Sequence, residues 1–323
     1  MELFSFTKPI DFMGKSKLSL AFSGFLVVAS IVLILFKGLN LGIDFAGGTL
    51  VQVKYDSAAP MKKMREVFAK DATFSGSTIS EFGSAQEVIV RVKKSSGDVT
   101  SDLGDVARKL LVGTGNFEIR RVDIVGPKVG NELREKGLMA MLLAIIGILI
   151  YISIRFEWRF AIASVFALIH DVSIAMGMLV VFNVDINLDI LAALLTILGY
   201  SLNDTIIVFD RIREGLMKSK TIDLFTVIND SVTKTLARTT LTSLTTFFVV
   251  LTLFLFGGEI IHGFAFTLLV GVIVGTYSSI FVASPLLKQF GFSIANYRNK
   301  LAMKDKREKE KARMRAQFEQ GSI

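Results

Sequence analysis

The chain has 323 residues, of which 51% are hydrophobic, and its mean hydropathy is +0.55. This composition is too apolar for a soluble domain of the same size and predicts a multi-pass membrane protein. The formal net charge is +8, and the sequence has no cysteine, which excludes disulfide bonds and thiolate metal sites.

Six segments are long and apolar enough to cross a bilayer, because an apolar core of about 30 Å needs roughly 20 residues per helix. They are residues 18–36, 137–154, 160–182, 188–209, 239–256 and 264–287. Lys15 and Lys17 precede the first segment as they would in a signal peptide. Its 19 residues exceed the usual apolar core of such peptides, and no small-x-small cleavage site follows, so we interpret it as an uncleaved anchor.

The distribution of Lys and Arg among short loops predicts the orientation of the chain. Twenty-one of these residues lie in segments on one side, and none lies in the short loops on the other. The basic segments are 1–17, 155–159, 210–238 and 288–323, and the loops without Lys or Arg are 183–187 and 257–263. We therefore expect both termini to be cytoplasmic and the long segment 37–136 to lie outside.

The stretch "GIDFAGG" (42–48) follows the first span and contains Gly42, Asp44, Gly47 and Gly48. Its glycines permit tight turns before a strand. One interpretation is a purely structural hinge. The other is a moving connection that couples the membrane region to the outer domain.

The rest of segment 37–136 predicts one small α+β domain. Val99, Leu103, Val106 and Leu110 have helical spacing, and Gly113 would end their helix. Strands are expected at 49–55, 78–82, 87–94 and 117–125, with helices at 60–70 and 98–113. This β-α-β-β-α-β order is the ferredoxin-like arrangement.

Charged residues inside spans are rare and usually functional, because one at mid-membrane costs about 2.5–3.5 kcal/mol on insertion scales. The third span contains His170 and Asp171 near its centre. The fourth contains Asn203 and Asp204, and Asp204 lies in its cytoplasmic half. These groups either lock helices together through hydrogen bonds or belong to a proton pathway. Asp210, at the end of the fourth span, is interpreted as an interfacial anchor.

The fifth span has a polar stripe on one helical face. It begins at Arg238, at a depth similar to that of Asp204, and continues through Thr242, Thr245 and Thr246. Together with Asn203, this stripe could line a water-accessible path. Before it, residues 221–236 have apolar side chains at helical spacing, which predicts a separate helix on the cytoplasmic membrane face within the loop 210–238.

The sixth span has a small residue at every fourth position, including Gly263, Gly271 and Gly275. Such a stripe allows close helix packing in lipid, either within the chain or with a partner. The basic tail 288–323 predicts a solvated helical or disordered extension near anionic lipid, or a contact with a ribosome or another partner.

No phosphate-binding GxxxxGK[ST] motif and no HExxH motif occurs in the sequence. These absences argue against an ATPase or a zinc hydrolase, and we expect no metal, cofactor or nucleic-acid ligand. An ion gradient is therefore the expected energy source.

Four stretches resemble signature segments of the SecF branch of the SecD/SecF family of protein-export proteins. They are "GIDFAGG" (42–48), "GYSLNDTIIVFDRIRE" (199–214), "ARTTLTSLTT" (237–246) and "GTYSSIFVASPLL" (275–287). The resemblance implies an α-helical polytopic protein of the bacterial inner membrane. It would form half of an RND-type transporter, with six transmembrane helices and a small ferredoxin-like extracytoplasmic domain.

The resemblance also implies partners and roles. SecD would supply the other half, SecYEG and YajC would be neighbours, and the proton-motive force would help to draw preproteins outward. Asp204 and Arg238 match the aspartate and arginine that the family links to proton conduction, and His170 and Asp171 match a motif of less defined role. Burial disfavours a charged carboxylate and a nearby arginine favours it, so relative motion of Arg238 and Asp204 would couple protonation to conformation. Two alternatives remain: proton-coupled efflux of a lipid or small molecule, and a structural assembly subunit without proton transport.

Overall fold

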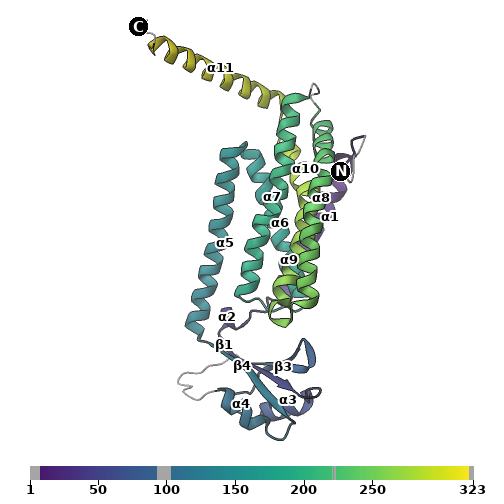
Figure 1. Cartoon of the computed structure of the whole chain (residues 1–323), viewed down its shortest axis with the longest axis vertical. Coiled ribbons are helices and arrows are strands. Elements are labelled where there is room, and N and C mark those ends of the chain that lie inside the picture. The colour runs from purple at the N-terminus through teal and green to yellow at the C-terminus, as the bar shows by residue number, and fades with distance from the viewer. Residues whose placement is uncertain (1–7, 93–102, 220, 222, 320–323) are drawn as a thin grey trace.

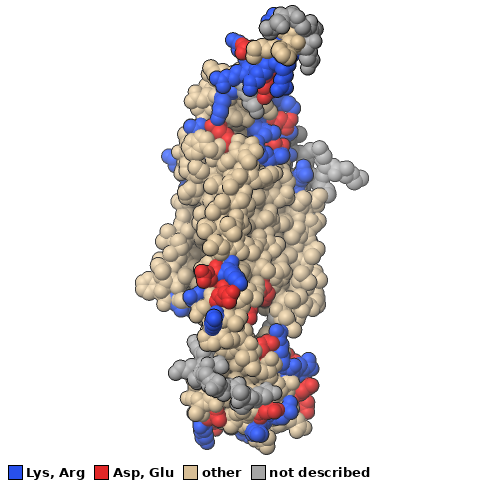
Figure 2. Space-filling view, turned by 90° about the vertical axis from the view of Figure 1, so that its left-hand side faces the viewer, with Lys and Arg blue, Asp and Glu red and all other residues tan. Residues whose placement is uncertain are grey.

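The computed structural model describes residues 8–92, 103–219, 221 and 223–319 (Figure 1). A small α/β domain lies at one end of a bundle of long helices. The start of helix α1 and the whole of helix α11 lie at the opposite end. In a second view, the middle of the molecule has few charged side chains, whereas Lys and Arg gather at the α11 end (Figure 2).

Six helical segments in the described part of the chain are long and apolar enough to span a membrane, as predicted. The bundle consists of α1 (Ser16–Lys37), α5 (Pro127–Arg155), α6 (Trp158–Val181), α7 (Leu188–Lys218), α8 (Leu224–Phe256) and α9 (Glu259–Ser278). A π-helical turn (Ser279–Ala283) and α10 (Ser284–Gln289) continue α9, and α11 covers Ile294–Glu319. A short 3-10 turn, Met13–Lys15, precedes α1. α6, α7 and α9 form the buried interior, and α1, α5 and α8 expose most of their surface.

Two bundle helices begin at different places than the hydropathy pattern predicts. α5 begins ten residues before position 137, because Pro127 occupies its first turn, where a missing N–H does not disturb the helix. The separate surface helix predicted at 221–236 is wrong. Its residues from Leu224 onward are the first turns of α8, a continuous helix of 33 residues. No Gly or Pro interrupts the sequence between Leu224 and Phe256, so nothing separates the surface turns from the span.

Asp223 caps the start of α8. Its carboxylate accepts hydrogen bonds from the backbone N–H groups of Phe225 (3.3 Å) and Thr226 (3.0 Å) and from the Thr226 hydroxyl (2.5 Å). The Thr226 hydroxyl is the first of the donors that hold the pKa of this carboxyl below its usual value. A carboxyl group with a lowered folded-state pKa stabilises the fold above its unfolded pKa, and that contribution is lost as the pH falls through the folded value.

We expect Asp223→Ala to lower the free energy of unfolding by about 0.5–2 kcal/mol at neutral pH, because the first turn of α8 loses its cap. The difference from wild type should shrink as the pH falls from the unfolded pKa of about 4 through the lower folded-state pKa, below which the carboxyl is protonated in both states. Asp223→Asn is the matched control, since Asn caps as well as Asp and does not titrate. Thermal unfolding in detergent at both pH values measures the effect, and an Ala penalty that is independent of pH would contradict the assignment.

The outer domain has the predicted β-α-β-β-α-β order. Its elements are β1 (Gly48–Tyr55), α3 (Met61–Lys70), β2 (Thr78–Phe82), β3 (Ser84–Val92), α4 (Leu103–Leu111) and β4 (Phe117–Val125). The strands form an antiparallel sheet in the order β2-β3-β1-β4, which is the ferredoxin-like topology. Val99, expected in the second helix, lies outside the described residues.

The domain has a core of its own on the helical side of the sheet. Val51, Val53 and Val90 from the strands pack with Met64 and Phe68 of α3 and with Leu111 of α4. The other face of the sheet borders a groove of roughly 1370 Å³ above the outer ends of the bundle helices. An ion pair between Arg91 of β3 and Asp185 of the α6–α7 loop connects the domain to the bundle. The open sheet face is thus held against the membrane region.

Candidate functional site

Asp204 lies inside the bundle at the contact of three helices. It is 1% exposed, and Oδ2 accepts a hydrogen bond from Ser243 Oγ of α8 at 3.0 Å. Thr276 of α9 donates in turn to Ser243 Oγ at 2.8 Å. The carboxylate of α7 therefore ends a short chain of hydroxyl groups that crosses from α9 through α8.

The second carboxylate oxygen of Asp204 is unusual. Among the residues that the structure describes, Oδ1 is buried and has no hydrogen-bond partner. Leaving a buried polar atom unpaired is costly, and an ionisable side chain within a span is commonly retained for function. This oxygen is the atom of the site at which a proton could bind and leave.

Arg238 does not contact Asp204. It is exposed on the surface of α8, and within the described residues it forms no ion pair. Thr242 and Thr245 share this outward face, as does Asn203 on the neighbouring α7. The Tyr200 hydroxyl lies 3.4 Å from the carbonyl oxygen of Thr242 and joins the two helices. We call the exposed side chains of Asn203, Arg238, Thr242 and Thr245, with the half-buried Tyr200, the outer polar face.

The residues of the predicted polar stripe do not contact Asp204 in the structure. Ser243 makes that contact, and it follows Thr242 by one residue, a turn of about 100° around the helix. The buried face of α8 contains Thr239 and Ser243 at a spacing of four. That second spacing is a signal in the sequence, but both faces contain hydroxyl groups, and only the packing of α8 distinguishes them. The sequence patterns do not single out Thr276 on α9 either.

His170 and Asp171 form a second buried network on α6. His170 Nδ1 lies 2.8 Å from Asp171 Oδ1. Asp171 Oδ2 accepts hydrogen bonds from Ser201 of α7 at 2.5 Å and from Ser278 of α9 at 2.8 Å. Asp171 is 0% exposed, so its carboxylate joins the three interior helices of the bundle at one point.

The two networks are adjacent along the same helices. Ser201 and Asp204 are three residues apart on α7 and so lie on one side of it. On α9, Thr276 belongs to the Asp204 network and Ser278 belongs to the Asp171 network. The π-helical turn begins directly after Ser278, and such turns often occur at functional sites. Displacement of α7 against α9 would change both carboxylate environments together.

The glycines of α9 face α7 within the chain. A Cβ atom at Gly271 would lie 2.2 Å from Ile197 Cγ1, and one at Gly275 would lie 2.9 Å from Ser201 Cβ. A Cβ atom at Gly263 would lie 3.2 Å from Ile190 Cδ1. Of the two packing partners expected for the stripe, the structure shows α7 of the same chain. Close approach at Gly275 brings Ser201 and Asp204 next to α9.

The "GIDFAGG" segment forms a packed junction between the outer domain and the bundle. It contains the short helix α2 (Ile43–Ala46). Asp44 Oδ2 accepts a hydrogen bond from the N–H of Leu188 at 3.0 Å, which caps the first turn of α7.

A Cβ at Gly42 would overlap the Asn187 side chain. Gly47 has a φ of 73°, and a Cβ there would lie 2.8 Å from Pro127 Cα at the start of α5. Gly48, also at positive φ (132°), begins β1.

This junction links the strand that enters the outer domain to the ends of α5 and α7. Asp44 thereby contacts the first turn of the helix that contains Asp204. Across the residues that the structure describes, no cluster of three or more His, Asp or Glu side chains could hold a metal ion.

Comparison with known proteins identifies the family. The model for the C-terminal region of the protein export membrane proteins SecD and SecF matches residues 106–293, and that for the SecD/SecF GG motif matches residues 32–59. The "Protein translocase subunit SecF" of Helicobacter pylori J99 is 47% identical over 323 residues, 100% of both chains. The protein of the same name from Escherichia coli O157:H7 is 41% identical over 287 residues, covering 88% of each chain.

Solved structures agree. The crystal structure of SecDF from Thermus thermophilus, described as a translocon-associated membrane protein, matches with a TM-score of 0.81 and 33% identity over 88% of this chain and 39% of that chain. A SecDF structure in a super-membrane-facing form matches with a TM-score of 0.66 and 32% identity, over 94% of this chain and 41% of that one. The chain thus spans about two fifths of each solved chain and the full length of the Helicobacter relative. It belongs to the SecF branch of the SecD/SecF family of protein export membrane proteins.

Proposed function

We propose that the chain is one half of a proton-driven export machine in the bacterial inner membrane, in which it pairs with a SecD partner beside the SecYEG channel and YajC. One observation carries the proposal. A buried carboxylate, Asp204, has an unpaired oxygen at the point where two neighbouring spans also expose polar side chains. A proton that crosses 100 mV releases about 2.3 kcal/mol, which can drive a conformational change.

The exposure of the outer polar face is evidence for a partner protein within the membrane. A guanidinium and an amide facing hydrocarbon are unfavourable, and in membrane proteins such groups usually face protein or a water-filled cavity. Arg238 and Asn203 are exposed in the isolated chain. The solved SecDF chains are much longer than this chain, and the rest of each would supply the missing half. A SecD-like partner against α7 and α8 would cover the outer polar face.

The same arrangement suggests how protonation would move the protein. Loss of a proton from Asp204 leaves a charge that one Ser243 hydrogen bond compensates only in part. Approach of Arg238 would compensate it more fully. Because α7 is capped by Asp44 at the junction, such a shift between α7 and α8 would reach the outer domain, where a preprotein is drawn outward.

Arg238 provides a graded test of this mechanism. We expect Arg238→Met to remove gradient-dependent export, because no cation remains to meet the Asp204 charge. Arg238→Lys should be partly active, because lysine keeps the positive charge but lacks the planar guanidinium, which can donate two parallel hydrogen bonds to a carboxylate. Arg211→Met is the matched control, because Arg211 forms an exposed pair with Glu214, of the kind that contributes little. Export of a model preprotein into inverted vesicles, with and without an imposed gradient, measures the effect. Full activity of Arg238→Met would show that Arg238 has no part in coupling.

The orientation of the chain is tested with single cysteines, which is direct because the natural sequence has none. Val112→Cys lies exposed in the outer domain, and Met217→Cys lies exposed near the end of α7. In cells with a permeabilised outer membrane, a membrane-impermeant maleimide should label Val112→Cys. Met217→Cys should react only after the inner membrane is opened, and its labelling in intact cells would reverse the proposed topology.

The hydrogen bond between Ser243 and Asp204 also supports a competing role, in which Asp204 only holds helices together in a structural assembly subunit. Asn at position 204 would hold the helices together equally well, so the Asp204→Asn variant separates this structural role from proton transfer. A transporter that exports a lipid or a small molecule on the same scaffold should respond to that molecule in the vesicle assay. A protein-export subunit should respond to the preprotein instead.

A further inference from the structure

The last helix, α11, is strongly basic, and most of its length is not covered by any other described part of the chain. Between Lys300 and Phe318 the sequence has eight Lys or Arg residues against three Asp or Glu residues, an excess of five positive charges. Every described side chain from Met303 to Phe318 is exposed. The helix leaves the bundle at a wide angle to the membrane helices (Figure 1). No described side chain of α11 takes part in the site around Asp204.

The base of α11 is fixed to the bundle. Arg298 donates hydrogen bonds to the carbonyl oxygens of Leu216 at 2.8 Å, Ser219 at 2.5 Å and Thr221 at 3.2 Å, all at or just beyond the end of α7. Phe292, just before α11, packs edge-on against Phe160 at 5.3 Å. The first turns of α11 are therefore held at the end of α7. Its basic part begins beside the end of a membrane span.

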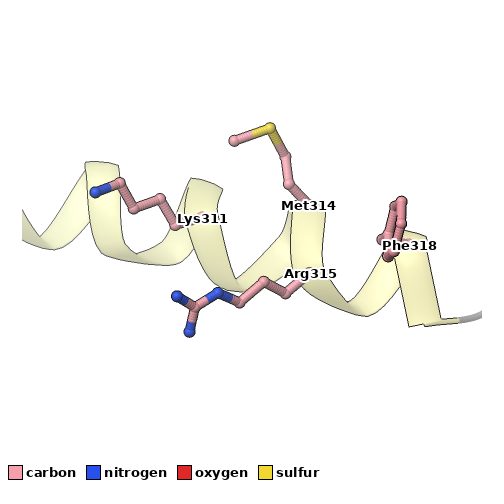
Figure 3. A pocket seen from close by; sticks show the side chains of 4 residues that line it. All are labelled: Lys311, Met314, Arg315 and Phe318. Atoms are coloured by element: carbon pink, nitrogen blue, oxygen red, sulfur yellow. The ribbon is translucent and has the colours of Figure 1, made fainter.

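The end of α11 also has a short apolar stripe, formed by Met314 and Phe318, which are one helical turn apart. These side chains are 59% and 75% exposed. Met303 lies three turns earlier, and Arg307 and Glu310 lie between it and Met314 on the same side of the helix. Met314 and Phe318 project to the same side of the helix, and Arg315 projects to the other (Figure 3). An apolar stripe flanked by cations is suited to a surface that is both apolar and anionic.

We propose that α11 lies on the membrane and binds anionic phospholipid headgroups, with Met314 and Phe318 inserted between them. Clusters of Lys and Arg directly after a membrane span are attracted to anionic lipid. A nucleic acid would match the cations but would leave the apolar stripe in water. A second α11 would match the stripe but bring two basic helices together. Only an anionic bilayer surface satisfies both features, and this inference does not depend on the export function.

The test places a reporter on the stripe of the full chain. The sequence has one Trp, Trp158, so Trp158→Phe gives a background in which Phe318→Trp is the only emitter. The protein is reconstituted in nanodiscs of phosphatidylcholine alone or mixed with phosphatidylglycerol. We expect a blue-shifted emission and several-fold stronger quenching by brominated acyl chains when phosphatidylglycerol is present. High salt should weaken both effects, because it screens the attraction.

Two controls make the result specific. Val112→Trp in the same background reports from the outer domain, where Val112 is exposed, and should not respond to phosphatidylglycerol. Replacing Lys306, Arg307, Lys309 and Lys311 by Gln should abolish the response of Phe318→Trp. Identical emission of Phe318→Trp in both lipids, without quenching, would overturn the proposal. So would a response to added RNA or ribosomes in place of phosphatidylglycerol.

Discussion

Asp204→Asn is expected to reduce gradient-stimulated preprotein export to the level seen without a gradient. Asn keeps the size of the side chain and can still accept the hydrogen bond from Ser243, now 3.0 Å from the carboxylate. It cannot gain or lose a proton. Insertion of the chain, its abundance and its partner binding should therefore stay normal while the energy coupling is lost.

The control for this variant is Asp210→Asn on the same helix. Asp210 lies near the C-terminal end of α7 and pairs with Arg213 at 3.1 Å. Its ion pair is partly exposed and should contribute little. Export into inverted vesicles is measured for both variants with and without an imposed gradient. If Asp204→Asn vesicles respond to the gradient as wild type does, then Asp204 is structural.

Gly271→Leu is expected to prevent normal folding of the chain or to reduce its stability severely. A Cβ atom at this position would already lie 2.2 Å from Ile197 Cγ1 and 2.4 Å from its Cδ1. Overpacking of a well-packed contact costs about 1–3 kcal/mol or more, because the helices must separate. Since α9 and α7 hold Thr276 and Asp204, the variant should also lose export activity at permissive temperature.

The matched control for Gly271→Leu is Gly147→Leu on α5. Gly147 is exposed, and an added Cβ there has no neighbour within 4 Å. Protein yield and thermal unfolding in detergent are measured for both variants. Equal yield and equal unfolding temperature for Gly271→Leu and wild type would show that the α7–α9 contact is looser than the structure indicates.

Much of the fold follows from local patterns in the sequence. The six spans are predictable because hydropathy depends on composition over about 20 residues and not on tertiary contacts. The outer domain is predictable because alternation in 117–125 and helical spacing in 103–111 differ clearly. The continuous α8 is harder to foresee. Charged residues such as Asp230 and Lys234 look like a surface helix, although no residue breaks the helix before the span.

The site is predictable only in part. Asp204 stands out because a carboxylate in an apolar run is costly wherever the helices pack. Its partner Ser243 does not, because α8 contains hydroxyl groups on two faces and the sequence gives no measure of which one is buried. Arg238 is a different case. The family resemblance predicts a role for it, yet it is exposed on α8 and does not contact Asp204 in the isolated chain, so a contact requires movement of the helix or of the side chain.

The central claim is that this chain, with its SecD partner, moves protons through Asp204. The most direct measurement is proton flux into proteoliposomes that contain the two-subunit complex, followed with a pH-sensitive dye under an imposed gradient. We predict a flux well above that of protein-free vesicles for the wild-type complex and none above it for the Asp204→Asn complex. A wild-type flux equal to that of protein-free vesicles, or an Asp204→Asn flux equal to wild type, would contradict the claim.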